Sequence, residues 1–190
     1  MQIEWNIGLN IEIFVDQQPW KIVRKSLFLK ELSALLKAAT EEELQEIFSQ
    51  IETRVAKEAA LFLLARRSYF TQELAGKLRQ KKLSSTSITY AISECQRLGY
   101  LDDALRTKSL VASQKARGVG PRLIALKLRQ KSGGVKCEEL EVGALDAARL
   151  YLDKRFKKRV LTREERQKAF MALQRRGFDL NTIQELLRSD

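Results

Sequence analysis

The sequence predicts an all-α fold of three tandem three-helix repeats, preceded by a small amino-terminal β-hairpin and helix segment. Three observations predict it. Only 2 of the 190 residues are proline, and both stand where a helical chain tolerates them. Apolar residues recur with a helical period from Ser26 onward, and one basic pattern occurs three times. Because each repeat is too small to bury its own apolar face, we expect the repeats to stack into an elongated array.

The first 24 residues have the pattern of a β-hairpin. Apolar residues occupy every odd position from Ile3 to Val15, which is the period of a strand with one buried face. Residues 16–19 are typical of a turn, and residues 20–24 follow as a returning strand. A lone hairpin is marginally stable in water, so we expect it to pack on the helices.

The first helices are expected to start at polar caps. Residues 40–43, Thr-Glu-Glu-Glu, have the capping-box pattern, and an apolar stripe follows from Leu44 to Phe62, as one long helix or two. Thr71 is expected to cap a short helix, and Ser84 or Ser85 the next one.

The later helices show similar signals. Gly99 is expected to end one helix, and the Asp102-Asp103 pair opens another. The Gly120-Pro121 pair indicates a helix start rather than a phosphate-binding loop, since the Lys-Ser/Thr ending and a preceding strand are missing. Thr162 to Glu165 forms a second capping box, and Asp179 is expected to cap the last helix.

The repeat defines the domain organisation. Lys77 to Lys82, Lys127 to Ser132 and Ala172 to Gly177 share one pattern, at spacings of 50 and 45 residues. We therefore predict a hairpin-plus-helix segment at 1–52 and three-helix repeats at 53–106, 107–146 and 147–190.

The charge is unevenly spread. The chain has 35 Lys and Arg against 24 Asp and Glu, yet residues 1–52 carry a net charge of −4 and residues 53–190 a net charge of +15. Lys77 and Lys127 each precede another lysine, Lys81 and Lys131, by four residues, so each pair is expected on one helical face. Such a basic track can neutralise phosphates, dock on an acidic protein groove, or serve as a solvated surface. The candidate partner-binding or DNA-binding residues are Arg66, Arg67, Lys77, Arg79, Lys81, Lys82, Lys115, Arg117, Arg122, Lys127, Arg129, Lys131, Lys154, Arg155, Lys157, Lys158 and Arg159.

The composition argues against an enzyme. Without histidine the chain cannot form a Ser-His-Asp or Cys-His nucleophile or a His-containing zinc site. Cys95 and Cys137 lie 42 positions apart, which fits neither a redox pair nor a metal cage. We predict no catalytic residue, no metal and no cofactor. The carboxylate pairs Asp102-Asp103 and Glu138-Glu139 are explained as helix-start residues.

The remaining side chains favour structural roles. Cys95 completes an apolar stripe and is expected to be buried, and Cys137 is expected in a loop with no chemistry. Most aromatic residues are expected to pack in the core rather than stack on bases. The longest apolar run, Ala59 to Ala65, is too short for a membrane helix, and the start of the chain lacks a signal-peptide pattern. We expect a cytoplasmic protein with no membrane association.

Several ordered segments resemble the bacterial RecX family of regulatory proteins. The first repeat is similar to the family at residues 60–67, Ala-Leu-Phe-Leu-Leu-Ala-Arg-Arg, and at residues 71–81. Leu98 to Asp103 resembles the family's most recognisable segment, and Arg117 to Arg122 resembles its second unit. Arg175 to Phe178, followed by Ile183, is similar to the third unit. The resemblance covers residues 53–190.

This resemblance implies a regulator of the RecA recombinase. Family members are tandem three-helix repeats that bind in the groove of the RecA filament on single-stranded DNA and inhibit its ATPase, strand-exchange and co-protease activities. The resemblance therefore implies a role in DNA repair and the SOS response, with the filament and single-stranded DNA as partners and double-stranded DNA as an alternative ligand. We expect a monomer.

Two other hypotheses stay open on the residues alone. The same basic track would suit a general DNA-binding architectural protein, which predicts tight, salt-dependent binding to naked DNA. A helical scaffold whose charge serves solubility predicts instead that reversing Lys77, Lys81, Lys127 and Lys131 changes no binding assay.

Overall fold

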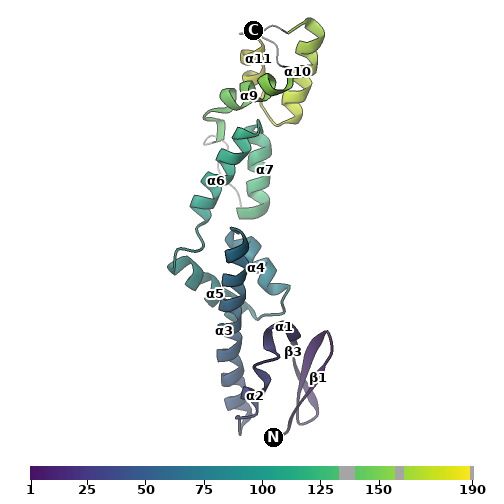
Figure 1. Ribbon diagram of the computed structural model, residues 1–190, viewed down its shortest axis with the longest axis vertical. Coiled ribbons are helices and arrows are strands. Elements are labelled where there is room, and N and C mark those ends of the chain that lie inside the picture. The colour runs from purple at the N-terminus through teal and green to yellow at the C-terminus, as the bar shows by residue number, and fades with distance from the viewer. Residues whose placement is uncertain (133–139, 157–160, 189–190) are drawn as a thin grey trace. The chain divides into compact units, whose positions relative to one another are not determined.

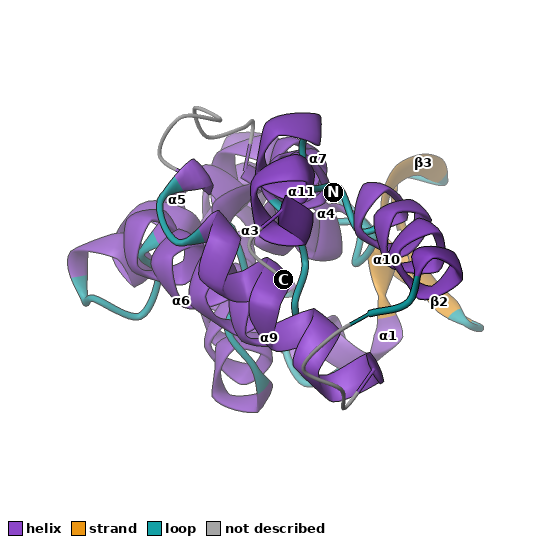
Figure 2. Cartoon of the chain, turned by 90° about the horizontal axis from the view of Figure 1, so that it is seen from above, coloured by secondary structure: helices purple, strands orange, loops and turns teal. Residues whose placement is uncertain are grey.

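The computed structural model describes residues 1–132, 140–156 and 161–188, and it is mostly helical with a small amino-terminal sheet (Figure 1). The predicted fold class is therefore confirmed. The chain divides into two compact units, Met1–Asp102 and Asp103–Asp190, here called unit 1 and unit 2. Strands are confined to the first 24 residues of unit 1, and helices form nearly all the rest of the described chain (Figure 2).

The sheet of unit 1 has three antiparallel strands where a two-stranded hairpin was predicted. In order they are β1 (Ile3–Ile7), β2 (Asn10–Val15) and β3 (Gln18–Arg24). The prediction of one strand from residue 3 to 15 is wrong, because the chain reverses at Gly8 and Leu9. The second turn lies where it was predicted. Asp16 and Gln17 have φ values of 47° and 66°, as a two-residue turn matched to the strand twist requires.

Five helices complete unit 1: α1 (Lys25–Phe28), α2 (Leu32–Leu35), α3 (Glu41–Arg66), α4 (Thr71–Arg79) and α5 (Ser85–Arg97). The stripe from residue 44 onward forms one continuous helix of 26 residues, not two. The hairpin packs on the helices as expected. Trp20 meets Phe48 of α3 edge-to-face at 5.1 Å, and Phe28 stacks on Phe48 at 5.7 Å. Ile11 and Ile13 of β2 belong to the same core.

The expected caps of unit 1 are confirmed in part. Thr40 accepts the Glu43 N–H at 3.2 Å, but the Glu43 carboxylate accepts the Ala39 N–H, so the capping box is only half formed. Ser84 caps α5. The prediction that Thr71 is a cap is wrong, because Thr71 is the first residue of α4 and lies inside the helix.

Unit 2 has the described helices α6 (Asp103–Ala116), α7 (Pro121–Ser132), α9 (Ala144–Phe156), α10 (Arg163–Arg175) and α11 (Leu180–Arg188). Its caps follow the predictions. Thr162 and Glu165 form the reciprocal capping box, and Asp179 Oδ1 accepts the Thr182 N–H at 2.6 Å. Leu173 and Phe178 lie in a core built from α9, α10 and α11. Cys137 and the Glu138-Glu139 pair lie outside the described residues.

Candidate functional site

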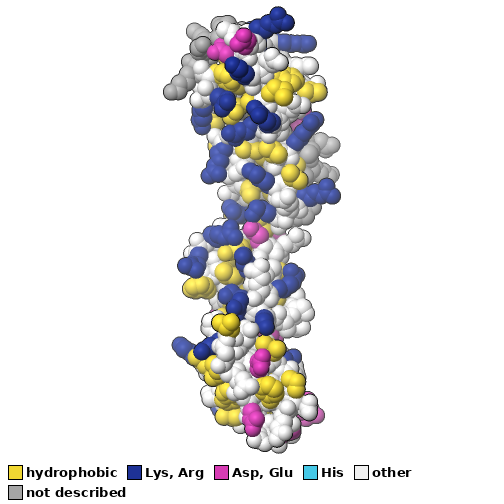
Figure 3. Space-filling model, turned by 90° about the vertical axis from the view of Figure 1, so that its right-hand side faces the viewer, with side chains coloured by type: hydrophobic (Ala, Val, Ile, Leu, Met, Phe, Trp, Pro, Cys, Tyr) yellow, Lys and Arg dark blue, Asp and Glu magenta, His cyan; other side chains and the backbone are white. Residues whose placement is uncertain are grey.

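The two units differ strongly in net charge. Unit 1 has 14 Lys and Arg against 13 Asp and Glu, a net charge of +1, whereas unit 2 has 21 against 11, a net charge of +10. On the face drawn in Figure 3, Lys and Arg side chains are numerous over unit 2 and few acidic side chains lie among them. The candidate site is therefore a basic surface, and its strongest charge lies in unit 2.

The cations of unit 1 follow the ends of α3 and α4. Arg66 lies over the Phe62 ring at 5.3 Å, and Arg67 lies over the Tyr69 ring at 4.1 Å. Arg67 is also 3.8 Å from Glu73, and the pKa of Arg67 is raised, first by its hydrogen bond with Tyr69 and then by the nearby charges. Arg67 is thus held in place by its neighbours and is partly compensated.

The second group of unit 1 cations lies at the end of α4, where Lys77, Arg79 and Lys82 are exposed. Lys77 Nζ donates to Gln80 Oε1 at 3.5 Å. Because α4 ends at Arg79, Lys81 lies in the turn that follows the helix, where its N–H donates to the Leu78 carbonyl at 2.9 Å. These cations surround a helix carboxyl terminus, where positive charge is stabilised by the helix dipole.

In unit 2 several cations are held by neutral oxygens. Lys127 Nζ donates to Gln114 Oε1 at 2.5 Å, and Lys154 Nζ donates to the Ala116 carbonyl at 3.4 Å. Lys115 Nζ donates to the Val142 carbonyl. Contacts of this kind orient an ammonium group without neutralising it, so the positive charge stays available to an anionic partner.

Three arginines of unit 2 take part in none of the described ion pairs. Within the described parts of the chain, Arg117, Arg122 and Arg129 have no carboxylate within 4 Å. Unit 1 differs, since Glu94 there binds Arg97 at 2.9 Å. Lys127 and Lys131 both lie within α7, so this predicted pair does share a helical face. Arg155 is exposed at the end of α9, over the Phe156 ring at 5.9 Å. The predicted residues Lys157, Lys158 and Arg159 lie outside the described residues.

A close backbone contact holds the two arginine-bearing loops of unit 2 together. The Gly120 N–H donates to the Arg176 carbonyl at 2.9 Å, and the Arg122 N–H donates to the Gly177 carbonyl at 3.1 Å. A Cβ on Gly120 would lie 2.4 Å from the Gly177 carbonyl carbon, so no other residue fits without a shift of the backbone. This contact fixes Arg117 and Arg122 relative to the end of α10.

Arg176 is a residue of this surface that the sequence reasoning missed. Its guanidinium lies 4.5 Å from the Tyr151 ring and donates to the Arg117 carbonyl at 3.2 Å. The sequence did contain a signal for Arg176. In the third copy of the basic pattern it occupies the position that Lys81 and Lys131, both candidate residues, hold in the first two copies. It joins α9, α10 and the loop before α7.

Most aromatic residues are buried or half-buried, but some are exposed. Phe70 and Phe178 are buried as expected. Tyr100, however, is 61% exposed, and so is Phe62, which the periodicity placed on the apolar stripe of α3. No element of unit 1 covers that side of α3, so the ring lies beside Arg66 at the surface. Tyr90 is also exposed, at 46%, so core packing accounts for most of the aromatic residues but not for these three.

No feature of the described residues resembles a catalytic centre. They contain no cluster of three Cys, Asp or Glu residues that could hold a metal ion. Cys95 is buried, and burial raises the pKa of its thiol, which disfavours the reactive thiolate. No helix of the described part is long and apolar enough to cross a membrane.

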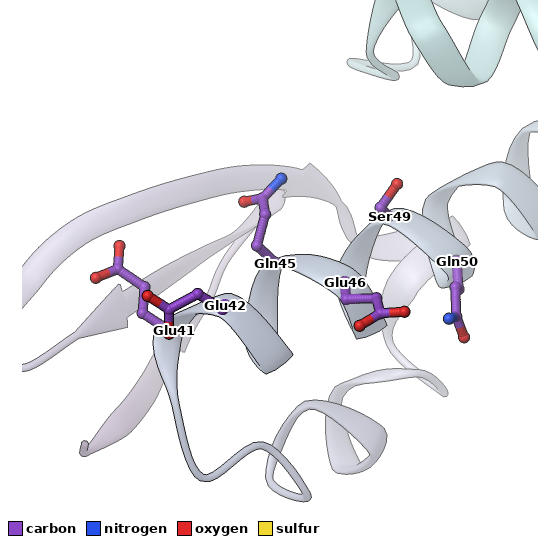
Figure 4. Close-up of a pocket in the computed structure, with 6 residues that line it drawn as sticks. All are labelled: Glu41, Glu42, Gln45, Glu46, Ser49 and Gln50. Atoms are coloured by element: carbon purple, nitrogen blue, oxygen red, sulfur yellow. The ribbon is translucent and has the colours of Figure 1, made fainter.

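The hollow on α3 also lacks the form of an active site. This hollow, drawn in Figure 4, is lined by Glu41, Glu42, Gln45, Glu46, Ser49 and Gln50. All six side chains extend from the first turns of α3, and no second element supplies a facing group. Convergent groups from several elements, which catalysis requires, are missing there.

Comparison with known proteins agrees with this fold. The family model of the first three-helix domain of RecX matches residues 56–95, and that of the third three-helix domain of RecX matches residues 143–187. Regulatory protein RecX of Legionella pneumophila (strain Corby) is 33% identical over 140 residues, which cover 70% of this chain and 93% of that protein. Regulatory protein RecX of Halorhodospira halophila (strain DSM 244 / SL1) is 34% identical over 137 residues, which cover 69% and 85%. A crystal structure of regulatory protein RecX shares the fold, with a TM-score of 0.62 and 17% identity over 100% of this chain and 98% of that one.

Fold and surface together define a protein built from three-helix domains whose second unit carries a net charge of +10. Both matched domains belong to one family, and the two relatives named above are covered over 93% and 85% of their length. The chain belongs to the RecX family of regulatory proteins.

Proposed function

We propose that this protein is a non-enzymatic cytoplasmic regulator that binds the RecA filament on single-stranded DNA. Binding inhibits the ATPase, strand-exchange and co-protease activities of the recombinase, as part of DNA repair and the SOS response. The observation that carries the proposal is the net charge of +10 on unit 2, where Arg117, Arg122 and Arg129 have no described carboxylate within 4 Å, in a chain of the RecX family.

The physical basis is electrostatic. A filament on single-stranded DNA presents a regular array of phosphates, and each Lys or Arg that contacts one releases a bound counterion. Binding then weakens with salt by about 0.7 in log affinity per log unit of salt for each such contact on a single strand. The cations that neutral oxygens hold in place, such as Lys127, lose little side-chain entropy on binding.

The test is a titration of the protein into RecA on single-stranded DNA at low salt, with ATP hydrolysis as the readout. Near-stoichiometric protein should inhibit hydrolysis. The double variant Lys127→Glu/Arg129→Glu should need a higher concentration and show a salt slope smaller by about 1.4, because two cations are lost. The matched control is Lys25→Glu/Lys30→Glu, which makes the same charge change on exposed residues of unit 1. Unchanged hydrolysis at near-stoichiometric wild-type protein would overturn the proposal.

The same surface supports a second candidate, a general architectural protein that binds DNA without RecA. An exposed cation such as Arg129 favours any polyanion, since phosphate contacts carry no sequence information. The two functions separate in a competition assay. A regulator of the filament prefers RecA-coated DNA over naked DNA of the same length, whereas an architectural protein binds both equally and leaves ATP hydrolysis unchanged.

A further inference from the structure

The sheet of unit 1 has an open edge at β1. The strand order is β1-β2-β3, so β1 pairs with β2 along one side and with no strand along the other. Figure 1 shows β1 as the outer strand of the sheet. Because the first RecX domain begins at residue 56, the sheet lies outside both matched domains. Any role of this edge is therefore additional to the family domains.

The backbone groups that face the open edge are known from the register. The Gly8 N–H donates to the Asn10 carbonyl at 2.9 Å, so the even-numbered residues of β1 form the bonds to β2. The N–H and C=O groups of Ile3, Trp5 and Ile7 consequently point away from the sheet. They form a short row of alternating donors and acceptors that can pair with another strand.

The other edge of the sheet is protected in the ways that proteins commonly use. β3 contains Pro19, which lacks an N–H, and Lys21, and its pairing with β2 is interrupted by a register shift. β1 contains no proline, lysine or register shift. Its last residue, Ile7, is 48% exposed, and Leu9 in the turn that follows is 93% exposed. Unprotected edges with exposed apolar residues are typical of strands that pair with another chain.

We propose that β1 pairs with β1 of a second copy of this chain, antiparallel, about a two-fold axis at Trp5. In this register Ile3 lies opposite Ile7 of the second copy, and Trp5 lies opposite its own equivalent. Glu4 faces Asn6 of the second copy, so no two like charges oppose each other. Every outward N–H and C=O of the three odd residues finds a partner. Any strand can supply backbone partners, but a second copy also places Ile3 against Ile7 twice and Glu4 against Asn6 twice, because the two-fold axis repeats each pair.

The dimer is weak, because a five-residue strand buries little surface. Interfaces below roughly 1,200 Å² are usual for transient association, so we expect a dissociation constant of about 10–100 µM. On DNA the local concentration is far higher. If the proposed function holds, the dimer presents two units of net charge +10 to one polyanion and gains affinity through multivalency.

Sedimentation of the full chain without DNA or RecA tests the dimer independently of the proposed function. Over about 1–200 µM the wild type should pass from monomer to dimer. Ile7→Pro removes an outward N–H and no bond to β2, so it should weaken dimerisation at least about tenfold. Ile22→Lys is the matched control: Ile22 is similarly exposed, at 51%, but lies on β3, so dimerisation should be unchanged. A wild type that stays monomeric throughout, or a dimer insensitive to Ile7→Pro, would overturn the proposal.

Cross-linking tests the register. Only a chain with both Glu4→Cys and Asn6→Cys places cysteines opposite each other across the proposed axis, and both positions are exposed. Mild oxidation should cross-link this double variant and leave each single variant at the level of the wild type. The wild type measures any cross-linking through the native cysteines. Equal cross-linking of the single variants would refute the register, and so would none in the double variant.

Discussion

Glu52 is a buried carboxylate that ties α3 to the start of α5, and its removal should destabilise unit 1. Its side chain is only 7% exposed. One oxygen accepts the Ser84 N–H at 2.9 Å, and the other accepts the hydroxyls of Ser84 and Ser87 at 2.5 and 2.9 Å. No Lys or Arg of the described chain lies within 4 Å of it. The three donors and the positive end of the α5 dipole therefore stabilise this charge.

The magnitude follows from the donors that Glu52→Ala leaves behind. A hydrogen bond to a charged group contributes about 1.5–3 kcal/mol, and a buried donor left without a partner costs about 1–3 kcal/mol. The three bonds share one carboxylate and Ser84 is exposed to water, so their contributions are not additive. We expect a loss of about 3 kcal/mol in the free energy of unfolding of unit 1. Glu52→Gln keeps one acceptor oxygen and should lose about 1–2 kcal/mol.

Urea unfolding followed by tryptophan fluorescence measures this loss, because the 2 tryptophans of the chain, Trp5 and Trp20, both lie in unit 1. Glu58→Ala is the control, since Glu58 is an exposed glutamate on the same helix and should change stability by less than about 0.5 kcal/mol. If Glu52→Ala also stays within about 0.5 kcal/mol of the wild type, the reasoning on buried hydrogen bonds fails.

Two further predictions concern the acid stability of unit 1 and the packing of unit 2. The hydrogen bond from Arg97 is the largest cause that lowers the pKa of Glu94 from 4.5 to about 2. A carboxyl group with a lowered pKa adds stability that is complete above its unfolded pKa and is lost as the pH falls towards the folded value. The wild type should therefore have a higher free energy of unfolding than Glu94→Gln above about pH 5, and this difference should disappear as the pH falls to about 2. Urea unfolding across that pH range measures the difference. A difference in free energy that stays constant with pH would contradict the assignment. Gly120→Ala should destabilise unit 2 by roughly 2 kcal/mol or more, because its Cβ would lie 2.4 Å from the Gly177 backbone. Gly76 lies inside α4, and no atom lies within 4 Å of a Cβ added there, so Gly76→Ala should instead stabilise unit 1 by about 0.5–1 kcal/mol. Thermal melts of both variants, followed by circular dichroism, measure the two effects. Equal effects of the two substitutions on stability would refute the packing argument.

The amino-terminal sheet shows why one strand was predicted where two exist. The turn at Gly8 and Leu9 pairs Ile7 with Ile11 and Ile3 with Val15, so odd residues face odd residues. The alternation of apolar residues therefore continues through the turn without a change of phase. Periodicity reports which face a side chain lies on, and it does not report the direction of the chain.

The sequence predicts which residues are charged, but not which of these charges are neutralised by a neighbour. The sequence identified the cations of both units, and the excess of positive charge after residue 52 is a property of composition. Which cations are neutralised depends on side chains that are distant in sequence. Arg67 reaches Glu73, whereas Lys127 reaches only the neutral Gln114. Arg176 was missed because its position over Tyr151 depends on contact between α9 and α10.

The sequence by itself determined the helices, because their starts depend on groups three residues apart, such as Thr162 and Glu165, which meet whenever the helix forms. It also determined the net charge and the absence of histidine chemistry. Only the tertiary structure decided that Phe62 is exposed, that Glu52 is buried, and that Gly120 lies against Gly177. The reason is that burial and close contact depend on which elements pack together, and residues far apart in the chain carry no local signal of their future neighbours.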